Sequence, residues 1–139
     1  RLGFGIGASS LIADLNTIKY STNPYNVNRM TMAAGVAALK DNGYYMNNCK
    51  TIIENRKWTS KELKKLGFTV TDSMTNFIFA KSDKIGGKEL YLALREKGVL
   101  VRHFDNPIIT DYNRITVGTR AQMETLLETV KTILEKGNE

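Results

Sequence analysis

Residues 99–104 are mostly β-branched and aromatic, and residues 113–119 carry Ile115, Thr116 and Val117. Both runs predict β-strands, and successive side chains on a strand point to opposite faces. The segment between them is rich in Asp, Asn and Pro, which favour turns, so we expect an antiparallel hairpin. If Arg102 lies opposite Arg114 in that hairpin, one face of the two strands is apolar and belongs to a core. The residues of this face are Val99, Val101, Ile115 and Val117.

The opposite face of the predicted hairpin carries Arg102 and Arg114 together. Two guanidinium groups repel each other unless an anion lies between them, and each can bind a carboxylate or a phosphate through two parallel hydrogen bonds. The pattern therefore predicts a site for a small anionic ligand. The alternative is that both arginines are solvated surface charges, as most charged strand residues are. The residue pattern alone leaves both interpretations open.

The first part of the chain is expected to hold one strand and two helices. Apolar residues alternate with glycines over residues 2–7, which is typical of a strand. Apolar residues at helical spacing predict a helix from Ser9 onward and a second helix over about residues 30–39, with a loop around Pro24 between them. A domain rarely begins inside a strand, so we expect this sequence to be a piece of a longer protein.

A long polar helix is expected over about residues 44–66, with one apolar stripe along it. Thr59 and Glu62 have the spacing of a capping box, a pair of side chains that caps the first turn of a helix. They predict a break in the long helix near Trp58. Gly67 is expected to end the helix, because glycine readily adopts the left-handed conformation that follows a last helical turn.

The order of elements from Phe68 onward predicts the fold class. Strands are expected over residues 68–71 and 76–80. A helix that Gly98 ends, the arginine hairpin and a last helix that Gly137 ends complete the series. The resulting β-β-α-β-β-α order is typical of an α+β unit, in which two helices cover one face of a sheet.

Composition and charge narrow the classes of function. The chain has 139 residues, 42% of them hydrophobic and 24% charged, which is ordinary for a soluble globular domain with an appendage. It contains one cysteine and one histidine, so an internal disulfide, a cysteine metal cluster and a histidine-rich metal site are excluded, and no metal is expected. No apolar run approaches the ~18 residues of a membrane helix. We therefore expect no membrane association and a cytoplasmic protein.

The net charge of +6 raises the question of nucleic acid binding. The lysines are scattered over several predicted helices and no aromatic residues interleave with them, which favours solvated helix faces over a binding stripe. A free-standing basic α+β module that binds nucleic acid or another anionic partner remains the alternative to the interpretation that follows.

Five short motifs occur in an order that resembles a known family. In these motifs the chain is similar to the C-terminal part of the pyridoxal-phosphate-dependent aminotransferases of class I/II. Within that class it is most similar to the histidinol-phosphate aminotransferases, which act in histidine biosynthesis. The resemblance implies the small C-terminal domain of a fold-type I transferase. The motifs are RLGFGIG (1–7), PYNVN (24–28), TNF (75–77), GVLVR (98–102) and RITVGTR (114–120).

The resemblance also implies roles for single residues. Arg1 matches the arginine that binds the cofactor phosphate in the family. Arg114 matches the arginine that holds the substrate α-carboxylate, and Arg102 matches the one that holds a second anionic group, a phosphate in the histidinol-phosphate branch. Tyr25 and Asn26 match a loop that reaches toward the active site of the partner subunit. The implied substrates are glutamate, 2-oxoglutarate and histidinol phosphate, the implied assembly is a homodimer, and no nucleic acid is implied.

The chain also departs from the family pattern. The lysine that carries the cofactor in the family lies shortly before the position of Arg1, so it is absent from this sequence. We therefore expect no catalytic residue in this piece, no covalently held pyridoxal phosphate and no transamination by the piece alone. Residues 1–43 are expected to be a remnant of the large cofactor-binding domain, with apolar surface left exposed around residues 11–20. Residues 44–139 are expected to form the small domain.

Overall fold

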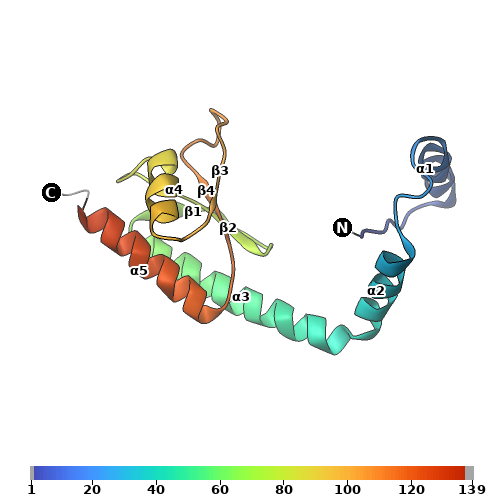
Figure 1. The fold of residues 1–139 in the computed structure, drawn as a ribbon, viewed down its shortest axis with the longest axis horizontal. Coiled ribbons are helices and arrows are strands. Elements are labelled where there is room, and N and C mark those ends of the chain that lie inside the picture. Colours follow the sequence, from blue (N-terminus) through green and yellow to red (C-terminus); the bar gives the residue numbers. More distant parts are fainter. Residues whose placement is uncertain (1, 137–139) are drawn as a thin grey trace. The chain divides into compact units, whose positions relative to one another are not determined.

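The computed structural model describes residues 2–136, and Figure 1 shows how their helices and strands are arranged within each part of the chain. The chain folds as two units, residues 1–46 and residues 47–139. Gly137, the expected end of the last helix, lies outside the described residues. The described helices are α1 (Ser9–Thr22), α2 (Arg29–Lys40), α3 (Asn42–Lys65), α4 (Gly87–Glu96) and α5 (Arg120–Lys136). The described strands are β1 (Phe68–Val70), β2 (Phe77–Ser82), β3 (Arg102–His103) and β4 (Asn113–Thr116).

Residues 2–7 of the first unit form no strand, so the strand expected at the start of the chain is wrong. An isolated strand leaves its backbone N–H and C=O groups without partners, and it becomes stable only beside another strand. Among the described residues, no strand pairs with this segment. The alternation of apolar residues with glycine is therefore present in the sequence, but the partner that would turn it into a strand is not.

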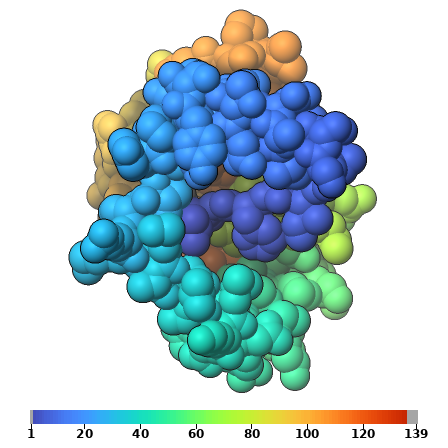
Figure 2. All heavy atoms as spheres, turned by 90° about the vertical axis from the view of Figure 1, so that its right-hand side faces the viewer, coloured from blue at the N-terminus to red at the C-terminus, as the bar shows by residue number. Residues whose placement is uncertain are grey.

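Helices α1 and α2 of the first unit have no buried residue. The Asn28 side chain caps α2 by accepting a hydrogen bond from the backbone N–H of Thr31 at 2.8 Å. Four of the large apolar side chains of α1 are between 51% and 66% exposed, and Figure 2 looks onto this unit, whose atoms run from dark blue to cyan. The expected exposure of this apolar surface is confirmed. The side chains are Leu11, Leu15, Ile18 and Tyr20.

Four antiparallel strands form the sheet of the second unit, in the order β1-β2-β4-β3. Their order along the chain, with α4 between β2 and β3 and α5 after β4, confirms the expected β-β-α-β-β-α series. Alternate residues of β2 and β4 are buried, which leaves one face of the sheet in the core and the other open. The open face is the one that carries the two arginines.

The core of the second unit lies between the sheet and three helices. Besides α4 and α5, which the sequence predicted, the second half of α3 covers the same face, because Leu63 of α3 is completely buried in this core. Figure 1 shows this part of α3 and α5 running beside each other against the sheet. The largest fully buried apolar side chains of the other elements are those of Ile78 of β2, Leu94 of α4 and Val130 of α5.

Helix α3 continues without interruption through the predicted break near Trp58, so that prediction is wrong. A capping box needs Thr59 at the helix start, but Thr59 is buried inside the helix together with Leu63 on the core side. Glu62, the other member of the pair, instead forms an ion pair with Lys65, whose Nζ lies 2.8 Å from a carboxylate oxygen. Burial of Leu63 therefore outweighs the local capping signal. Gly67 does end the helix, with a φ of 91°.

Gly98 connects α4 to the hairpin with a φ of 77°, a conformation that side chains other than glycine rarely adopt. A methyl group added at Gly98 would meet nothing within 4 Å beyond its chain neighbours, so Gly98→Ala is a test of backbone conformation alone. We expect it to lower the free energy of unfolding by about 1–2 kcal/mol. Thermal unfolding followed by circular dichroism would measure this loss.

The matched control for Gly98→Ala is Gly86→Ala. Gly86 also has open space around it, but its φ of −63° is ordinary for alanine. A loss in Gly86→Ala as large as that in Gly98→Ala would show that the cost does not come from the left-handed conformation.

Candidate functional site

The register of the hairpin places Arg102 of β3 directly opposite Arg114 of β4. Both side chains are exposed on the open face, while Ile115 and Val117 are buried in the core, so the expected division of the hairpin into two faces is confirmed. Val99 and Val101 pack against the same core as expected.

One aromatic ring lies beneath both guanidinium groups. The Cζ atoms of Arg102 and Arg114 are 5.3 Å and 5.7 Å from the centre of the Phe104 ring. Arg114 also lies 5.5 Å from the ring centre of Phe77 on β2. Because both groups lie over one ring and the two residues are paired in the ladder, both guanidinium groups lie on the same face of the sheet.

The aromatic surface extends beyond the arginines along the open face. The ring of Phe79 stacks on Tyr112 with 4.6 Å between ring centres, and it meets Phe104 edge-on at 6.5 Å. Lys81 of β2 lies with its Nζ 5.7 Å from the Tyr112 ring centre. The open face is therefore a set of aromatic rings beneath three cationic side chains. Such a surface attracts anions, and the rings hold the charged groups in place.

Helix α3 anchors the two loops next to the arginine strands. The Asn55 side chain donates a hydrogen bond to the backbone oxygen of Gly118 at 2.9 Å, just after β4. The buried Arg56 donates a hydrogen bond to the backbone oxygen of Thr75, just before β2. The backbone N–H of Val117 donates to the oxygen of Asn76 at 2.9 Å and joins the two loops. The motifs TNF and RITVGTR are thus held to one another and to one helix.

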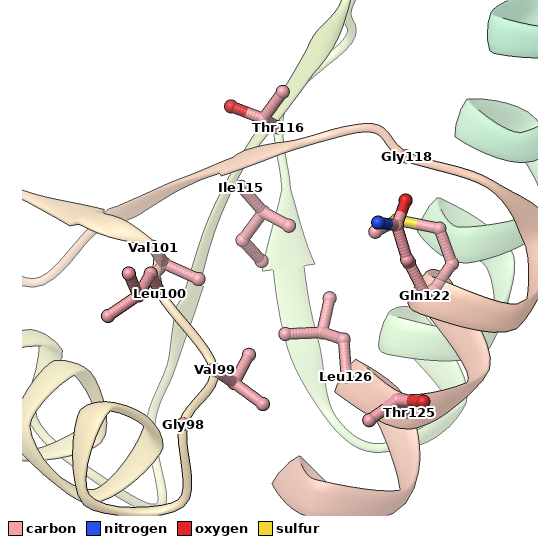
Figure 3. A pocket seen from close by; sticks show the side chains of 11 residues that line it. Gly98, Val99, Leu100, Val101, Ile115, Thr116, Gly118, Gln122, Thr125 and Leu126 are labelled. Carbon is pink, nitrogen blue, oxygen red and sulfur yellow. The ribbon is translucent and has the colours of Figure 1, made fainter.

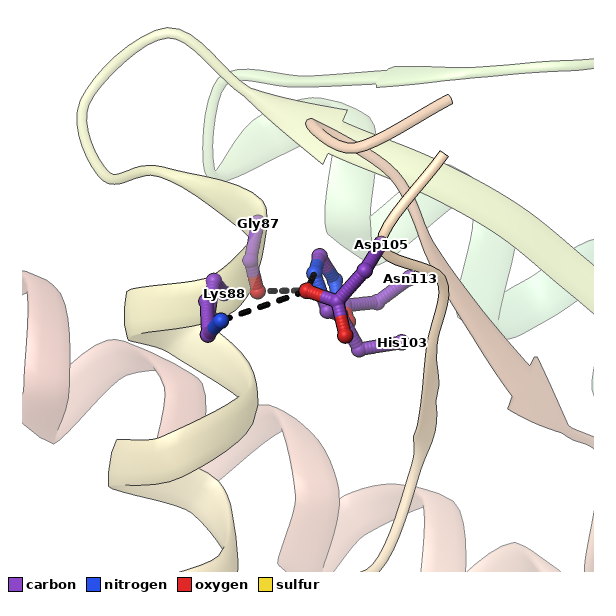
Figure 4. A network of polar contacts seen from close by, with 5 residues as sticks. All are labelled: Gly87, Lys88, His103, Asp105 and Asn113. Carbon is purple, nitrogen blue, oxygen red and sulfur yellow. Dashed lines mark hydrogen bonds and ion pairs between the residues drawn. The ribbon is translucent and has the colours of Figure 1, made fainter. Parts of the chain in front are cut away.

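On the other side of the hairpin, α4 holds the residues that flank Phe104. The side chain of His103 is 5% exposed and stacks on Tyr91 at 5.9 Å between ring centres. The carboxylate of Asp105 lies 3.2 Å from Lys88 Nζ and 3.6 Å from His103 Nε2, as Figure 4 shows. The buried Asn113 adds a hydrogen bond of 2.8 Å from its side-chain amide to the backbone oxygen of Gly87.

A pocket of about 400 Å³ lies on the core side of the hairpin, between residues 98–101 and the first turns of α5 (Figure 3). Its lining is mostly apolar, and none of its described lining residues is cationic. The polar Gln122 on its wall is already engaged, because its Oε1 accepts a hydrogen bond from the backbone N–H of Thr119 at 2.9 Å. The pocket therefore suits an anionic ligand less well than the open face does.

A family model described as aminotransferase class I and II matches residues 1–130. The chain belongs to the class I and II aminotransferases. The match supports the aminotransferase interpretation of the sequence, because it extends over nearly the whole chain.

Curated relatives of this aminotransferase chain are histidinol-phosphate aminotransferases. The chain is 44% identical over 135 residues to the enzyme of Brachyspira hyodysenteriae, which covers 97% of the chain and 38% of that enzyme. It is 36% identical over 136 residues to the enzyme of Clostridium botulinum strain Okra, covering 98% of the chain and 38% of the relative. The chain thus spans little more than a third of the length of the curated relatives it matches.

Solved structures of the same kind share the fold. The histidinol-phosphate aminotransferase of Clostridium acetobutylicum superposes with a TM-score of 0.78 at 26% identity, covering 87% of this chain and 37% of that one. The enzyme of Sinorhizobium meliloti, solved in complex with pyridoxal-5'-phosphate, gives a TM-score of 0.78 at 20% identity and covers 89% of this chain and 34% of its own. The expected fold, a part of a fold-type I transferase, is confirmed.

Enzymes of this family depend on pyridoxal phosphate, and the pocket-lining lysines of α3 do not fit the attachment of that cofactor. A lysine that attaches a cofactor needs an environment shielded from water, which lowers the pKa of its amino group. Lys57, Lys61 and Lys64 line a pocket between α3 and the loop after β1, but all three are exposed. Arg1, the residue expected to bind the cofactor phosphate, lies outside the described residues.

The remaining expected site residues lie in the first unit. Tyr25 is 92% exposed and Asn26 is exposed in the loop between α1 and α2. Their expected contact with a partner subunit stays a prediction, as does the assignment of residues 1–43 and 44–139 to a large and a small domain.

Several residues of the site were not identified from the sequence. Phe104 follows Arg102 by two positions, and Phe77 and Phe79 are two positions apart on β2, so the same period of two that placed the arginines could have placed these rings. Arg56 interrupts the apolar stripe of α3, and a buried arginine there could have been inferred from its position. Thr119 and Gln122 form a capping box at the start of α5 that was also missed.

None of the helices within residues 2–136 is long and apolar enough to cross a membrane. Among the same residues, no group of three or more His, Cys, Asp or Glu side chains is placed to hold a metal ion.

Proposed function

We propose that the open face of the sheet is the substrate-anchoring part of a histidinol-phosphate aminotransferase, in which Arg102 and Arg114 bind the anionic groups of the substrates. The observation that carries this proposal is the pairing of the two arginines in register, with both guanidinium groups exposed above one ring. The names of the relatives at 36–44% identity support the choice of substrate.

The chemistry of the substrates suits a pair of guanidinium groups. Glutamate and 2-oxoglutarate carry two carboxylates, so Arg114 can hold the α-carboxylate while Arg102 holds the second one. Histidinol phosphate carries a phosphate, and its several oxygens can accept hydrogen bonds from a planar guanidinium fork. In this proposal the arginines bind and orient the substrate, and Arg102 contributes to selectivity by binding the second anionic group, either a carboxylate or a phosphate.

The proposal extends to contacts of this chain with the cofactor and with a second subunit. Pyridoxal phosphate would supply the chemistry of amino-group transfer, and Arg1 would contact its phosphate. Tyr25 and Asn26 would contact the active site of a second subunit in a cytoplasmic homodimer. The 139-residue chain alone would bind substrate anions without transaminating them and without holding the cofactor covalently.

A binding comparison between histidinol phosphate and histidinol tests the role of Arg102. The chain is expected to bind the phosphorylated compound more tightly, and Arg102→Gln should remove most of this preference. Because the open face is exposed to water, which screens the ion pair, the change is expected to be up to about fivefold in Kd. Two-dimensional NMR titrations of the 139-residue chain can measure such weak binding.

The control for Arg102→Gln is Arg95→Gln, which removes the same charge from α4, where Arg95 lies 5.5 Å from the Tyr91 ring centre and away from the open face. If both variants lose the preference for histidinol phosphate over histidinol equally, the net charge of the chain explains that preference, and the phosphate does not bind at Arg102. If the unaltered chain binds histidinol and histidinol phosphate alike, the proposed substrate is wrong.

A further inference from the structure

We propose that Phe104 is a positioning residue for substrate binding, because its ring is the shared support that holds Arg102 and Arg114 next to each other. The inference rests on the proposed function for the purpose of the arginine pair. It adds a residue outside the five motifs that carry the family resemblance, since Phe104 lies just after GVLVR and well before RITVGTR.

The first argument is electrostatic. Like charges directly opposite each other on neighbouring strands destabilise the pair, so Arg102 and Arg114 would be expected to turn away from each other. An aromatic ring has a negative face, which attracts a guanidinium group. The Phe104 ring lies within 5.7 Å of both Cζ atoms, so it attracts both groups toward one place and opposes their repulsion.

The second argument is that the ring is itself held in place. Strand β3 ends at His103, so Phe104 lies beyond the paired residues and its position depends on side-chain contacts. Its neighbour His103 packs on α4, and its other neighbour Asp105 pairs with Lys88 at 3.2 Å. On the open face, Phe79 meets the Phe104 ring edge-on. The ring is therefore fixed through both flanking residues and through β2.

The third argument is that the two phenylalanine rings near the arginines contact different numbers of guanidinium groups. Phe77 lies beneath Arg114 alone, at 5.5 Å from its Cζ atom, whereas Phe104 contacts both arginines. Phe104 should therefore influence both anion positions of the substrate, and Phe77 only the position at Arg114. This difference gives the inference a matched control within the same face of the sheet.

The test compares Phe104→Leu with Phe77→Leu in the 139-residue chain by NMR of arginine side chains. A ring beneath a guanidinium group shifts the resonances of the nearby side-chain protons. We expect Phe104→Leu to move the resonances of both Arg102 and Arg114, and Phe77→Leu to move those of Arg114 only. Phe104→Tyr keeps the ring and should leave both sets near their original positions, which separates loss of the ring from general disturbance of the fold.

The same samples are then titrated with inorganic phosphate. We expect Phe104→Leu to raise the Kd for phosphate roughly two- to fivefold, and Phe104→Tyr to restore it. The inference is overturned if Phe104→Leu leaves the Arg102 resonances in place, or if it moves them without weakening phosphate binding. If the unaltered chain does not bind phosphate, the proposed function fails instead, and the side-chain resonances still decide whether one ring holds both arginines.

Discussion

Replacing Arg114 with lysine is expected to lower kcat/KM for glutamate roughly tenfold to a hundredfold in an active enzyme that contains this chain. Charge is kept in this variant, but an ammonium group cannot form the two parallel hydrogen bonds that a guanidinium fork makes with a carboxylate. Losing one charge-assisted hydrogen bond in a closed active site costs about 1.5–3 kcal/mol, which corresponds to this range of rates. The loss should exceed that seen in the open, water-exposed chain.

A suitable enzyme for this measurement is a chimera in which the chain replaces the matching 38% of the Brachyspira hyodysenteriae histidinol-phosphate aminotransferase. The control is Arg120→Lys, a residue of the same motif whose guanidinium stacks on Trp58 of α3 at 3.9 Å, on the helix side of the second unit. A chimera that tolerates Arg114→Lys as well as it tolerates Arg120→Lys would contradict the proposed role of Arg114 in carboxylate binding.

Replacing Leu63 with alanine is expected to lower the free energy of unfolding of the second unit by about 2–5 kcal/mol. Leu63 is completely buried, and a shortened side chain leaves a cavity that the surrounding core fills only in part. A total stability of about 5–15 kcal/mol is typical of a domain, so this loss would be a large share of it. Urea unfolding monitored by the fluorescence of Trp58, which also lies in α3, would measure it.

The control for Leu63→Ala is Ile53→Ala on the same helix. Ile53 is 40% exposed and should cost far less when shortened. Equal losses in the two variants would mean that the second half of α3 does not belong to the core of the sheet. If the midpoint falls while the slope of the unfolding free energy against urea concentration is unchanged, the variant unfolds from the same compact state.

The sequence predicted those parts of the fold that depend on neighbouring residues in the chain. The hairpin could be predicted because two runs of strand-forming residues flank a segment rich in turn-forming residues. Gly67 and Gly98 end their helices as expected. The left-handed conformation after a last helical turn depends on that residue alone, so a glycine in the sequence is enough to predict it. The same locality explains why the sequence could place the two arginines on one face and raise the hypothesis of an anion site there.

What could not be predicted depends on contacts between distant segments. The capping signal at Thr59 was local and correct in spacing, but burial of Leu63 against the sheet overrode it. Residues 2–7 have the alternation of a strand, but forming one requires a partner that the described chain does not supply. The position of Arg56 in the apolar stripe indicates its burial, but its hydrogen-bond partner Thr75 lies in a loop beyond the helix and could not be predicted.

The short ladder between β3 and β4 determines where the second unit can tolerate insertions or deletions. Residues 106–111 lie outside the ladder, so insertions or deletions within them can reshape the rim of the open face while both arginines keep their positions. A single residue added or removed between Gly98 and Arg102 has the opposite effect, because it exchanges the two faces of β3. The guanidinium of Arg102 would then turn toward Tyr91, and the imidazole of His103 would take its place above the rings.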